Sequence, residues 1–198
     1  MTASLSVVGT YSRSIGASLE RMFENAVDWE HLPWLHASSF SSISCDDAGR
    51  WGFRASVGLA GRGEEVGLEL LLDRDRRQWV SRTSDGTEIW TVATATGART
   101  CRVDVEFHVP RPRPGLGAHY VELYTRLYDE DESMMVGRQQ YLDRAFSGAA
   151  PRCPHRGGPL APCATDPALL QCPWHGYRFD ASTGECLDDP SLRLRPRV

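Results

Sequence analysis

Hydrophobic and polar residues alternate along the first half of the chain, a period typical of β-strands. The clearest run, residues 100–109, places apolar side chains at every second position: Cys101, Val103, Val105, Phe107 and Val109. Further strands are predicted near residues 5–11, 39–45, 51–59, 65–73, 77–83 and 88–95. Turn dipeptides such as Asp85-Gly86 separate neighbouring strands, which favours antiparallel hairpins.

Two segments have helical periodicity instead. Residues 14–31 carry an apolar stripe, and residues 119–145 form a longer helix after the Pro/Gly-rich break at 111–117. A strand, a helix, six antiparallel strands and a long closing helix resemble the helix-grip fold of the START and polyketide-cyclase-like superfamily. The resemblance implies an α+β domain whose curved sheet wraps the long helix and leaves a cavity for an apolar ligand.

The pattern changes after this domain, which we place at residues 1–146. Residues 147–151 (SGAAP) are predicted to be a short linker. Residues 152–198 are rich in Pro and Gly, and a segment this small can hardly build its own core. We therefore expect the C-terminal segment to depend on a cofactor and on docking for its stability.

Four potential metal ligands lie in this segment. Cys153-x-His155 is followed after sixteen residues by Cys172-x-x-His175. Two thiolates can hold one iron of a two-iron, two-sulfur cluster while two imidazoles hold the other. The surrounding sequences, CPHRGGPL and CPWHGYRFDASTGEC, resemble the Rieske family, and the resemblance implies a [2Fe–2S] cluster on these four residues.

The same residues allow two other interpretations. Two Cys and two His also satisfy tetrahedral zinc, although zinc sites of this class usually begin with a Cys-Cys pair. The six cysteines could instead form disulfides, but the spacing pairs Cys with His. Cys163 and Cys186 lie outside the ligand pattern, and for Cys186 we expect a packing role.

A second group of potential ligands lies near the end of the first predicted helix. Asn25, Asp28 and His31 follow one another at i, i+3 spacing, which places them on one helix face. Pro33 is expected to end the helix, and the break can turn His36 back toward His31. Two imidazoles and one carboxylate with open positions form the facial triad of non-haem iron(II) oxygenases.

This segment resembles the N-x-x-D-x-x-H-x₄-H motif of Rieske non-haem iron oxygenases. The resemblance implies that His31 and His36 bind a mononuclear Fe(II). It also implies that Asp28 connects this iron to a cluster histidine of a neighbouring subunit, and that Asn25 lies near the iron. The alternative is that the two histidines only cap a helix end, where imidazolium is favourable.

The carboxylate of the triad is predicted on the long helix. The apolar stripe of that helix contains Tyr124, Leu127, Tyr128, Met134, Met135, Tyr141 and Leu142. Asp131 falls within the stripe, where an unpaired carboxylate would be costly. Asp129 and Glu130 fall outside it and are expected to be solvated, while Glu132 is borderline. YDEDESMMVGRQQ resembles the family segment that supplies the carboxylate ligand, which implies Asp131; the alternative is a solvated acidic run.

Composition narrows the possible partners of the 198-residue chain. With 41% hydrophobic and 24% charged residues it is typical of a globular protein. The net charge of −4 and the lack of a Lys/Arg-rich run disfavour nucleic acid and anionic membranes. The longest apolar stretch, 68–72, is too short for a membrane span, and no signal peptide is recognisable. We therefore expect a reducing, cytoplasmic location.

These features predict a compact Rieske-type oxygenase. It would take electrons from an external reductase or ferredoxin and act with O₂ on an apolar or aromatic substrate. The resemblance also implies a homo-oligomer, although in the family the Rieske domain comes first and here it comes last. The alternatives are a non-catalytic electron-transfer protein with a ligand-binding domain, and a structural zinc module fused to such a domain.

Overall fold

The computed structural model describes residues 4–143 and 151–194. It separates into two compact units, Met1–Met135 and Val136–Val198. The predicted linker, 147–151, lies outside the described residues except for Pro151. The six cysteines are all described, and all are free thiols.

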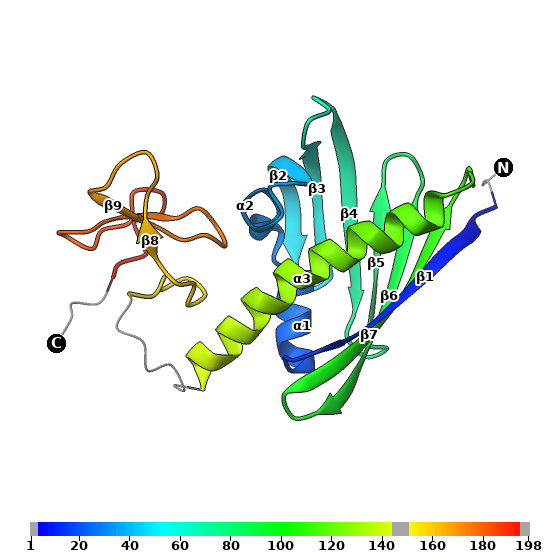
Figure 1. Cartoon of the computed structure of the whole chain (residues 1–198), viewed down its shortest axis with the longest axis horizontal. Helices are drawn as coiled ribbons and strands as arrows, with labels where there is room; N and C mark the ends of the chain where they lie inside the picture. Colours follow the sequence, from blue (N-terminus) through cyan, green and yellow to red (C-terminus); the bar gives the residue numbers. More distant parts are fainter. Residues whose placement is uncertain (1–3, 144–150, 195–198) are drawn as a thin grey trace. The chain divides into compact units, whose positions relative to one another are not determined.

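The first unit is built on a seven-stranded antiparallel sheet with the order β1-β7-β6-β5-β4-β3-β2 (Figure 1). Its strands are β1 (Ser6–Ile15), β2 (Phe40–Gly49), β3 (Gly52–Leu59), β4 (Glu65–Asp73), β5 (Gln78–Thr83), β6 (Glu88–Gly97) and β7 (Thr100–Val109). From β2 to β7 each strand pairs with its sequence neighbour, whereas β1 crosses over to pair with β7. The predicted α+β fold class is confirmed.

Alternation along the strands decides which side chains enter the core. The five apolar residues of β7 that the sequence singles out are 0–2% exposed. Their polar neighbours lie on the opposite face, because successive side chains of a strand point to opposite sides. One face of the sheet is therefore apolar and needs a covering element.

Helix α3 (Leu116–Leu142) supplies that cover and runs across the sheet (Figure 1). The ring of Phe107 on β7 lies with its centroid 5.2 Å from that of Tyr120 and 5.0 Å from that of Tyr124. Tyr11 on β1 stacks on Tyr128 at 5.8 Å. These aromatic contacts hold one face of α3 against β1 and β7. The predicted apolar stripe does not extend to Leu142, which is 43% exposed.

The segment between β1 and β2 differs from the predicted helix over 14–31. Strand β1 continues to Ile15, because its residues pair with β7 as far as Cys101. Helix α1 (Leu19–Ala26) begins after Ser18, whose hydroxyl accepts a hydrogen bond from the Arg21 N–H and so caps the helix. A 3₁₀ turn, η1 (Trp29–His31), and a short helix, α2 (Leu32–Leu35), follow.

Pro33 therefore does not end a helix as predicted. It lies in the first turn of α2, where its missing N–H would have had no helical partner. Leu32 before it keeps α-helical backbone angles (φ −50°, ψ −53°). The helix that begins at Leu19 ends at Ala26 instead.

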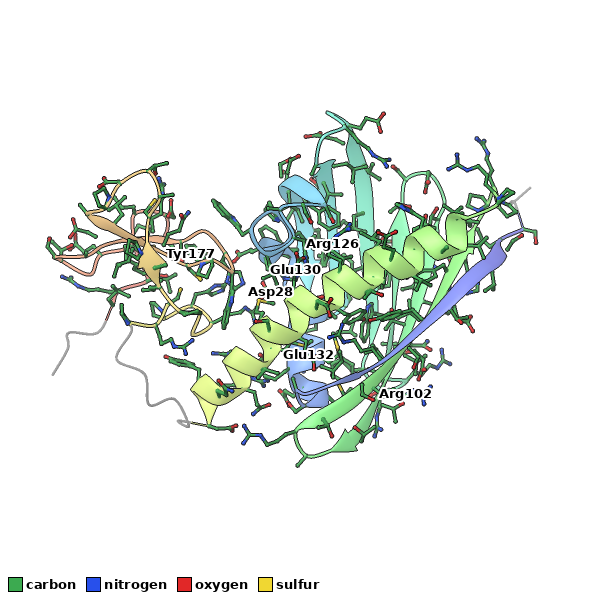
Figure 2. The ribbon with its side chains drawn as sticks, viewed as in Figure 1. Asp28, Arg102, Arg126, Glu130, Glu132 and Tyr177 are labelled. Carbon is green, nitrogen blue, oxygen red and sulfur yellow. The ribbon has the colours of Figure 1, made fainter. Side chains whose placement is uncertain are left out.

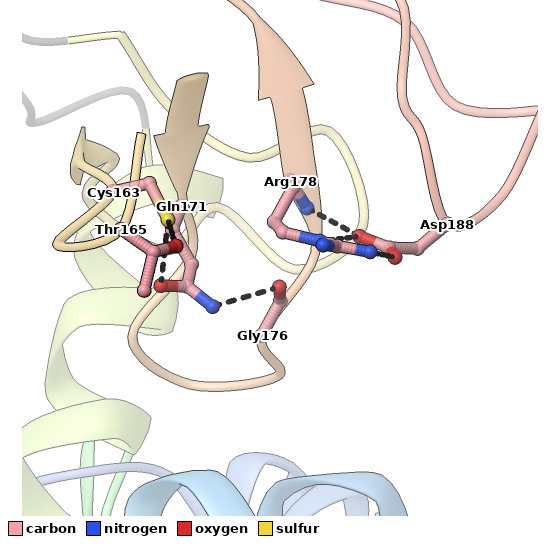
Figure 3. A network of polar contacts seen from close by, with 6 residues as sticks. All are labelled: Cys163, Thr165, Gln171, Gly176, Arg178 and Asp188. Carbon is pink, nitrogen blue, oxygen red and sulfur yellow. Dashed lines mark hydrogen bonds and ion pairs between the residues drawn. The ribbon is translucent and has the colours of Figure 1, made fainter. Parts of the chain in front are cut away.

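The second unit contains a small antiparallel sheet of β8 (Ala161–Pro162), β9 (Leu169–Gln171) and β10 (Arg178–Asp180) in the order β10-β9-β8. Polar contacts connect its loops (Figure 3). The Arg178 backbone N–H and guanidinium both donate to the Asp188 carboxylate, with N–O distances of 2.5–3.2 Å. Gln171 donates to the Gly176 carbonyl at 3.3 Å. These hydrogen bonds thus help to hold the loops of the second unit, whose apolar core is small.

Candidate metal centres

The four C-terminal ligand candidates converge in the second unit. Cys153 and Cys172 have no exposed surface, and His175 is buried. The ring centroids of His155 and His175 lie 4.6 Å apart in an edge-to-face arrangement. Two thiols and two imidazoles thus meet from two loops, which is the donor set of a mixed-ligand [2Fe–2S] cluster.

Both loops use the same backbone pattern. The N–H of Gly157 donates to the Cys153 carbonyl at 2.8 Å, and the N–H of Gly176 donates to the Cys172 carbonyl at 2.9 Å. In each loop the cysteine N–H donates to the carbonyl five residues later, at 2.9 Å. The two glycines have φ angles of +78° and +72°, which residues with a Cβ adopt only at a cost. Glycine four residues after each cysteine therefore lets the loop close.

The two buried thiols interact strongly. A hydrogen bond from Cys153, helped by one from His175, lowers the pKa of Cys172 to about 5 against the opposing effect of burial. The same contact, together with burial, raises the pKa of Cys153. The loop geometry thus favours a thiolate at Cys172, the form in which cysteine binds metal.

A second cluster of ligands forms in the first unit. His31, His36 and Asp131 are 4%, 2% and 8% exposed, and one ligand atom of each lies within 4.8 Å of the others. The Oδ1 atom of Asp131 is 3.0 Å from His36 Nε2 and 3.5 Å from His31 Nε2. Two imidazoles and one carboxylate therefore face a common point, which fits the donor set of a facial triad.

The short helix α2 brings the two histidines together. His31 ends η1 and His36 follows α2, whose turn closes with a hydrogen bond from the His36 N–H to the Leu32 carbonyl at 3.2 Å. The two rings lie 5.1 Å apart at an angle of 74°. Two histidines five residues apart would point in different directions on a regular helix. The turn formed by α2 brings the side chains of His31 and His36 together instead.

Helix α3 contributes two neighbouring carboxylates to this site. Asp131 is buried, and the Glu130 Oε2 atom lies 2.6 Å from His36 Nδ1. Burial lowers the pKa of His36, but hydrogen bonds and charge attraction from Asp131 and Glu130 outweigh it and raise that pKa above 6.5. The prediction of a solvated Glu130 is wrong, because its side chain is only 31% exposed and reaches the His36 ring from α3. Figure 2 labels Glu130 on this helix.

Asn25, Asp28 and His31 do not share one helix as predicted, because Asn25 lies in α1, Asp28 follows that helix and His31 lies in η1. Asn25 is near the end of α1, and Asp28 follows it with φ −88° and ψ 75°, which is not helical. Both are buried, at 7% and 4% exposure. The Oδ1 atom of Asn25 has no hydrogen-bond partner among the described residues. A buried acceptor of this kind is costly unless another group satisfies it.

Comparison with known families identifies the C-terminal part of the chain. Residues 122–196 match the family model for the Rieske [2Fe-2S] domain. The chain carries a Rieske domain. This domain implies a [2Fe–2S] cluster, and the convergence of Cys153, His155, Cys172 and His175 fits such a group.

Curated relatives match short stretches of the chain. Mouse apoptosis-inducing factor 3 is 40% identical over 47 residues, which are 24% of this chain and 8% of that protein. The oxygenase subunit of 3-chlorobenzoate-3,4-dioxygenase from Comamonas testosteroni is 38% identical over 64 residues, 30% of this chain and 15% of the subunit. The chain thus matches only a small fraction of either relative's length.

Solved structures resemble the fold of a large part of the chain. The Zhui aromatase/cyclase from Streptomyces sp. R1128 superposes with a TM-score of 0.54 at 11% identity, covering 68% of this chain and 96% of that one. At this identity the likeness shows the fold, which is the START-like helix-grip fold predicted from the element order. No helix among the described residues has the length and apolarity to cross a membrane.

Proposed function

We propose that this protein is a compact Rieske-type oxygenase, in which the [2Fe–2S] cluster supplies electrons to a mononuclear iron at His31, His36 and Asp131. The observation that carries the proposal is the convergence of these three buried ligands in a chain that also has a Rieske domain. A mononuclear iron of this ligation activates O₂ for reaction with an organic substrate.

The protein's own residues have separate tasks in this proposal. His31 and His36 offer Nε2 atoms and Asp131 offers Oδ1, which leaves other positions of the metal open. Asp28 is the residue we propose to connect the iron to a cluster histidine. Asn25 is proposed to hold a group near the iron, because its buried Oδ1 is an acceptor with no partner among the described residues.

The proposal of an apolar or aromatic substrate is supported by the aromatic residues that lie where α3 packs on the sheet. Tyr11, Tyr124 and Tyr128 form a row of rings with centroid distances of 5.8 and 6.0 Å. Burial, followed by the charges of a neighbouring tyrosine and of Asp131, raises the pKa of both Tyr124 and Tyr128, so both phenols stay protonated. Tyr128 precedes Asp131 by three residues on α3, and aromatic rings on the same helix as the proposed ligand suit an aromatic substrate.

The proposal also includes an electron donor and a location. Proteins with this domain receive electrons from a reductase or ferredoxin, and we propose such a donor here. We further propose a homo-oligomer and a cytoplasmic location. A reducing compartment is consistent with six free cysteines, two of which are proposed to bind the cluster as thiolates.

Iron analysis of the purified protein tests the proposal. The protein should contain about three irons per chain, two of them with the acid-labile sulfide of the cluster. His36→Ala should lower the content by about one iron and leave the visible absorption of the cluster unchanged. His119→Ala, an exposed histidine of α3, serves as the matched control and should keep all the iron. Unchanged iron content in His36→Ala would refute the mononuclear site.

A second candidate function is electron transfer without oxygenation, with the helix-grip domain binding a ligand. The match to the Rieske domain over residues 122–196 supports it, because a [2Fe–2S] cluster can transfer electrons without a second metal. The same iron analysis separates the two functions. About two irons with sulfide, in wild-type protein and in His36→Ala alike, would support electron transfer alone.

A further inference from the structure

We propose that Glu130 is a positioning residue that holds the Nδ1–H of His36 and thereby leaves Nε2 free to bind the metal. This inference rests on the mononuclear metal site proposed above. It concerns a residue that is not one of the three predicted ligands, and it follows from the contacts on the two sides of one imidazole ring.

The His36 ring lies between two carboxylates. The Nδ1 atom is 2.6 Å from Glu130 Oε2, and the Nε2 atom is 3.0 Å from Asp131 Oδ1. The imidazole itself is 2% exposed, so water competes little for either nitrogen. The carboxylates differ in their surroundings, because the Asp131 side chain is 11% exposed and the Glu130 side chain is 31% exposed.

The orientation of His31 indicates which ring nitrogen of His36 is positioned to bind the metal. His31 turns its Nε2 atom toward the same Asp131 oxygen, at 3.5 Å. The two Nε2 atoms and Asp131 Oδ1 therefore surround one point, whereas Glu130 approaches His36 from the other ring nitrogen. On a helix, consecutive residues differ in direction by about 100°, so Glu130 and Asp131 can approach the ring from different sides.

The proton on the imidazole ring explains why the contact with Glu130 matters for metal binding. A neutral imidazole carries one N–H and one lone pair, and the hydrogen bond made by one nitrogen decides where the proton stays. A carboxylate only accepts, so Glu130 retains the proton on Nδ1 and leaves the lone pair on Nε2. A histidine ligand whose N–H is held by a carboxylate is fixed in orientation and is a more basic donor.

Metal binding in three variants tests this role. The labile mononuclear iron is removed by mild chelation that spares the cluster, and Fe(II) uptake is measured by anaerobic equilibrium dialysis. Glu130→Leu removes the acceptor, and we expect Fe(II) binding about 10–100-fold weaker than in the wild type. Glu130→Gln keeps a neutral acceptor and should weaken binding less. Glu122→Gln, an exposed glutamate of the same helix, is the control and should bind like the wild type.

A spectroscopic measurement separates positioning from a merely structural effect. In cluster-loaded protein with Zn²⁺ at the second site and ¹⁵N-labelled histidine, the Nδ1–H proton of His36 should exchange slowly with solvent. In Glu130→Leu it should exchange at least about tenfold faster, because an unheld N–H is open to water. A general loosening of the fold would speed exchange in other buried histidines as well.

The outcomes distinguish this inference from the function on which it rests. If wild-type protein binds no Fe(II) beyond its cluster, the proposed mononuclear site is refuted. If wild-type protein binds Fe(II) and His36→Ala does not, but Glu130→Leu binds with wild-type affinity and keeps the slow Nδ1–H, the role of Glu130 is refuted. Should Glu130→Leu fail to fold, Glu130→Gln decides, because it has nearly the same shape and still predicts weaker binding.

Discussion

Replacing Glu132 by alanine should loosen the attachment of α3 to the first strand of the sheet. The Oε2 atom of Glu132 accepts two hydrogen bonds from the Arg13 guanidinium, with N–O distances of 3.1 and 2.6 Å. The Oε1 atom accepts the Gly16 backbone N–H at 2.7 Å. One carboxylate thus joins α3 to both β1 and the turn that precedes α1. This attachment sets the rotation of α3 that turns the neighbouring Asp131 inward.

The expected loss follows from these contacts. A hydrogen bond to a charged group contributes about 1.5–3 kcal/mol, whereas the Gly16 N–H belongs to an exposed residue, where water can replace its lost partner. The Arg13 and Glu132 side chains are 23% and 25% exposed, so water screens part of the interaction. Arg13 also keeps its ion pair with Asp129. We therefore expect Glu132→Ala to cost about 2–3 kcal/mol of unfolding free energy, and Glu132→Gln about half of that.

Guanidinium chloride unfolding followed by tryptophan fluorescence measures this loss. Most of the tryptophans, including the buried Trp79, lie in the first unit, so the signal reports on its sheet. With a slope of about 4 kcal/mol per M, the midpoint of Glu132→Ala should fall by about 0.6 M. Asp129→Asn is the control, because Asp129 is 62% exposed and its ion pair should contribute below about 1 kcal/mol. Equal midpoints for Glu132→Ala and Asp129→Asn would refute the reasoning.

Three further outcomes are expected. Gly176→Ala places a Cβ at φ +72°, which should lower the stability of the ligand loop by about 1–2 kcal/mol. The visible absorption of the cluster should then disappear faster at elevated temperature; an unchanged lifetime would contradict the need for glycine at this position. Hydrogen bonds from Ser182 and Thr183 lower the pKa of Asp180 from 3.8 to about 2, so this carboxylate stabilises the second unit above pH 4, and the stabilisation is lost as the pH falls toward 2. Asp180→Asn should therefore be less stable than the wild type near neutral pH, and the difference in stability should become smaller in acid, as measured by circular dichroism. Ser18→Ala removes the N-cap of α1 and should lower the unfolding free energy of the first unit by about 1 kcal/mol in thermal unfolding, whereas Ser18→Asp should retain it.

Much of the fold could be predicted from local sequence, because local periodicity and turn chemistry act within a few residues. The alternation in β7 reports burial directly, and its five apolar residues are buried. The helix over 14–31 was the main error. Its first residues have enough apolar character for either structure, and pairing with β7 decides in favour of a strand up to Ile15. That pairing joins residues about 90 positions apart, which no local pattern reports.

The spacing of Cys153, His155, Cys172 and His175, together with their flanking sequences, resembled the Rieske family. Sequence could carry this resemblance because each ligand pair lies in a short loop whose closure is local. The second ligand group depended on tertiary structure. His36 and Glu130 are 94 residues apart in sequence, and only the packing of α3 against the sheet brings the carboxylate to within 2.6 Å of the ring. Sequence determined which residues have the chemistry of ligands. The tertiary structure decided which nitrogen of His36 each carboxylate contacts, because α3 packs on β1 and β7 and thereby brings Glu130 to Nδ1 and Asp131 to Nε2.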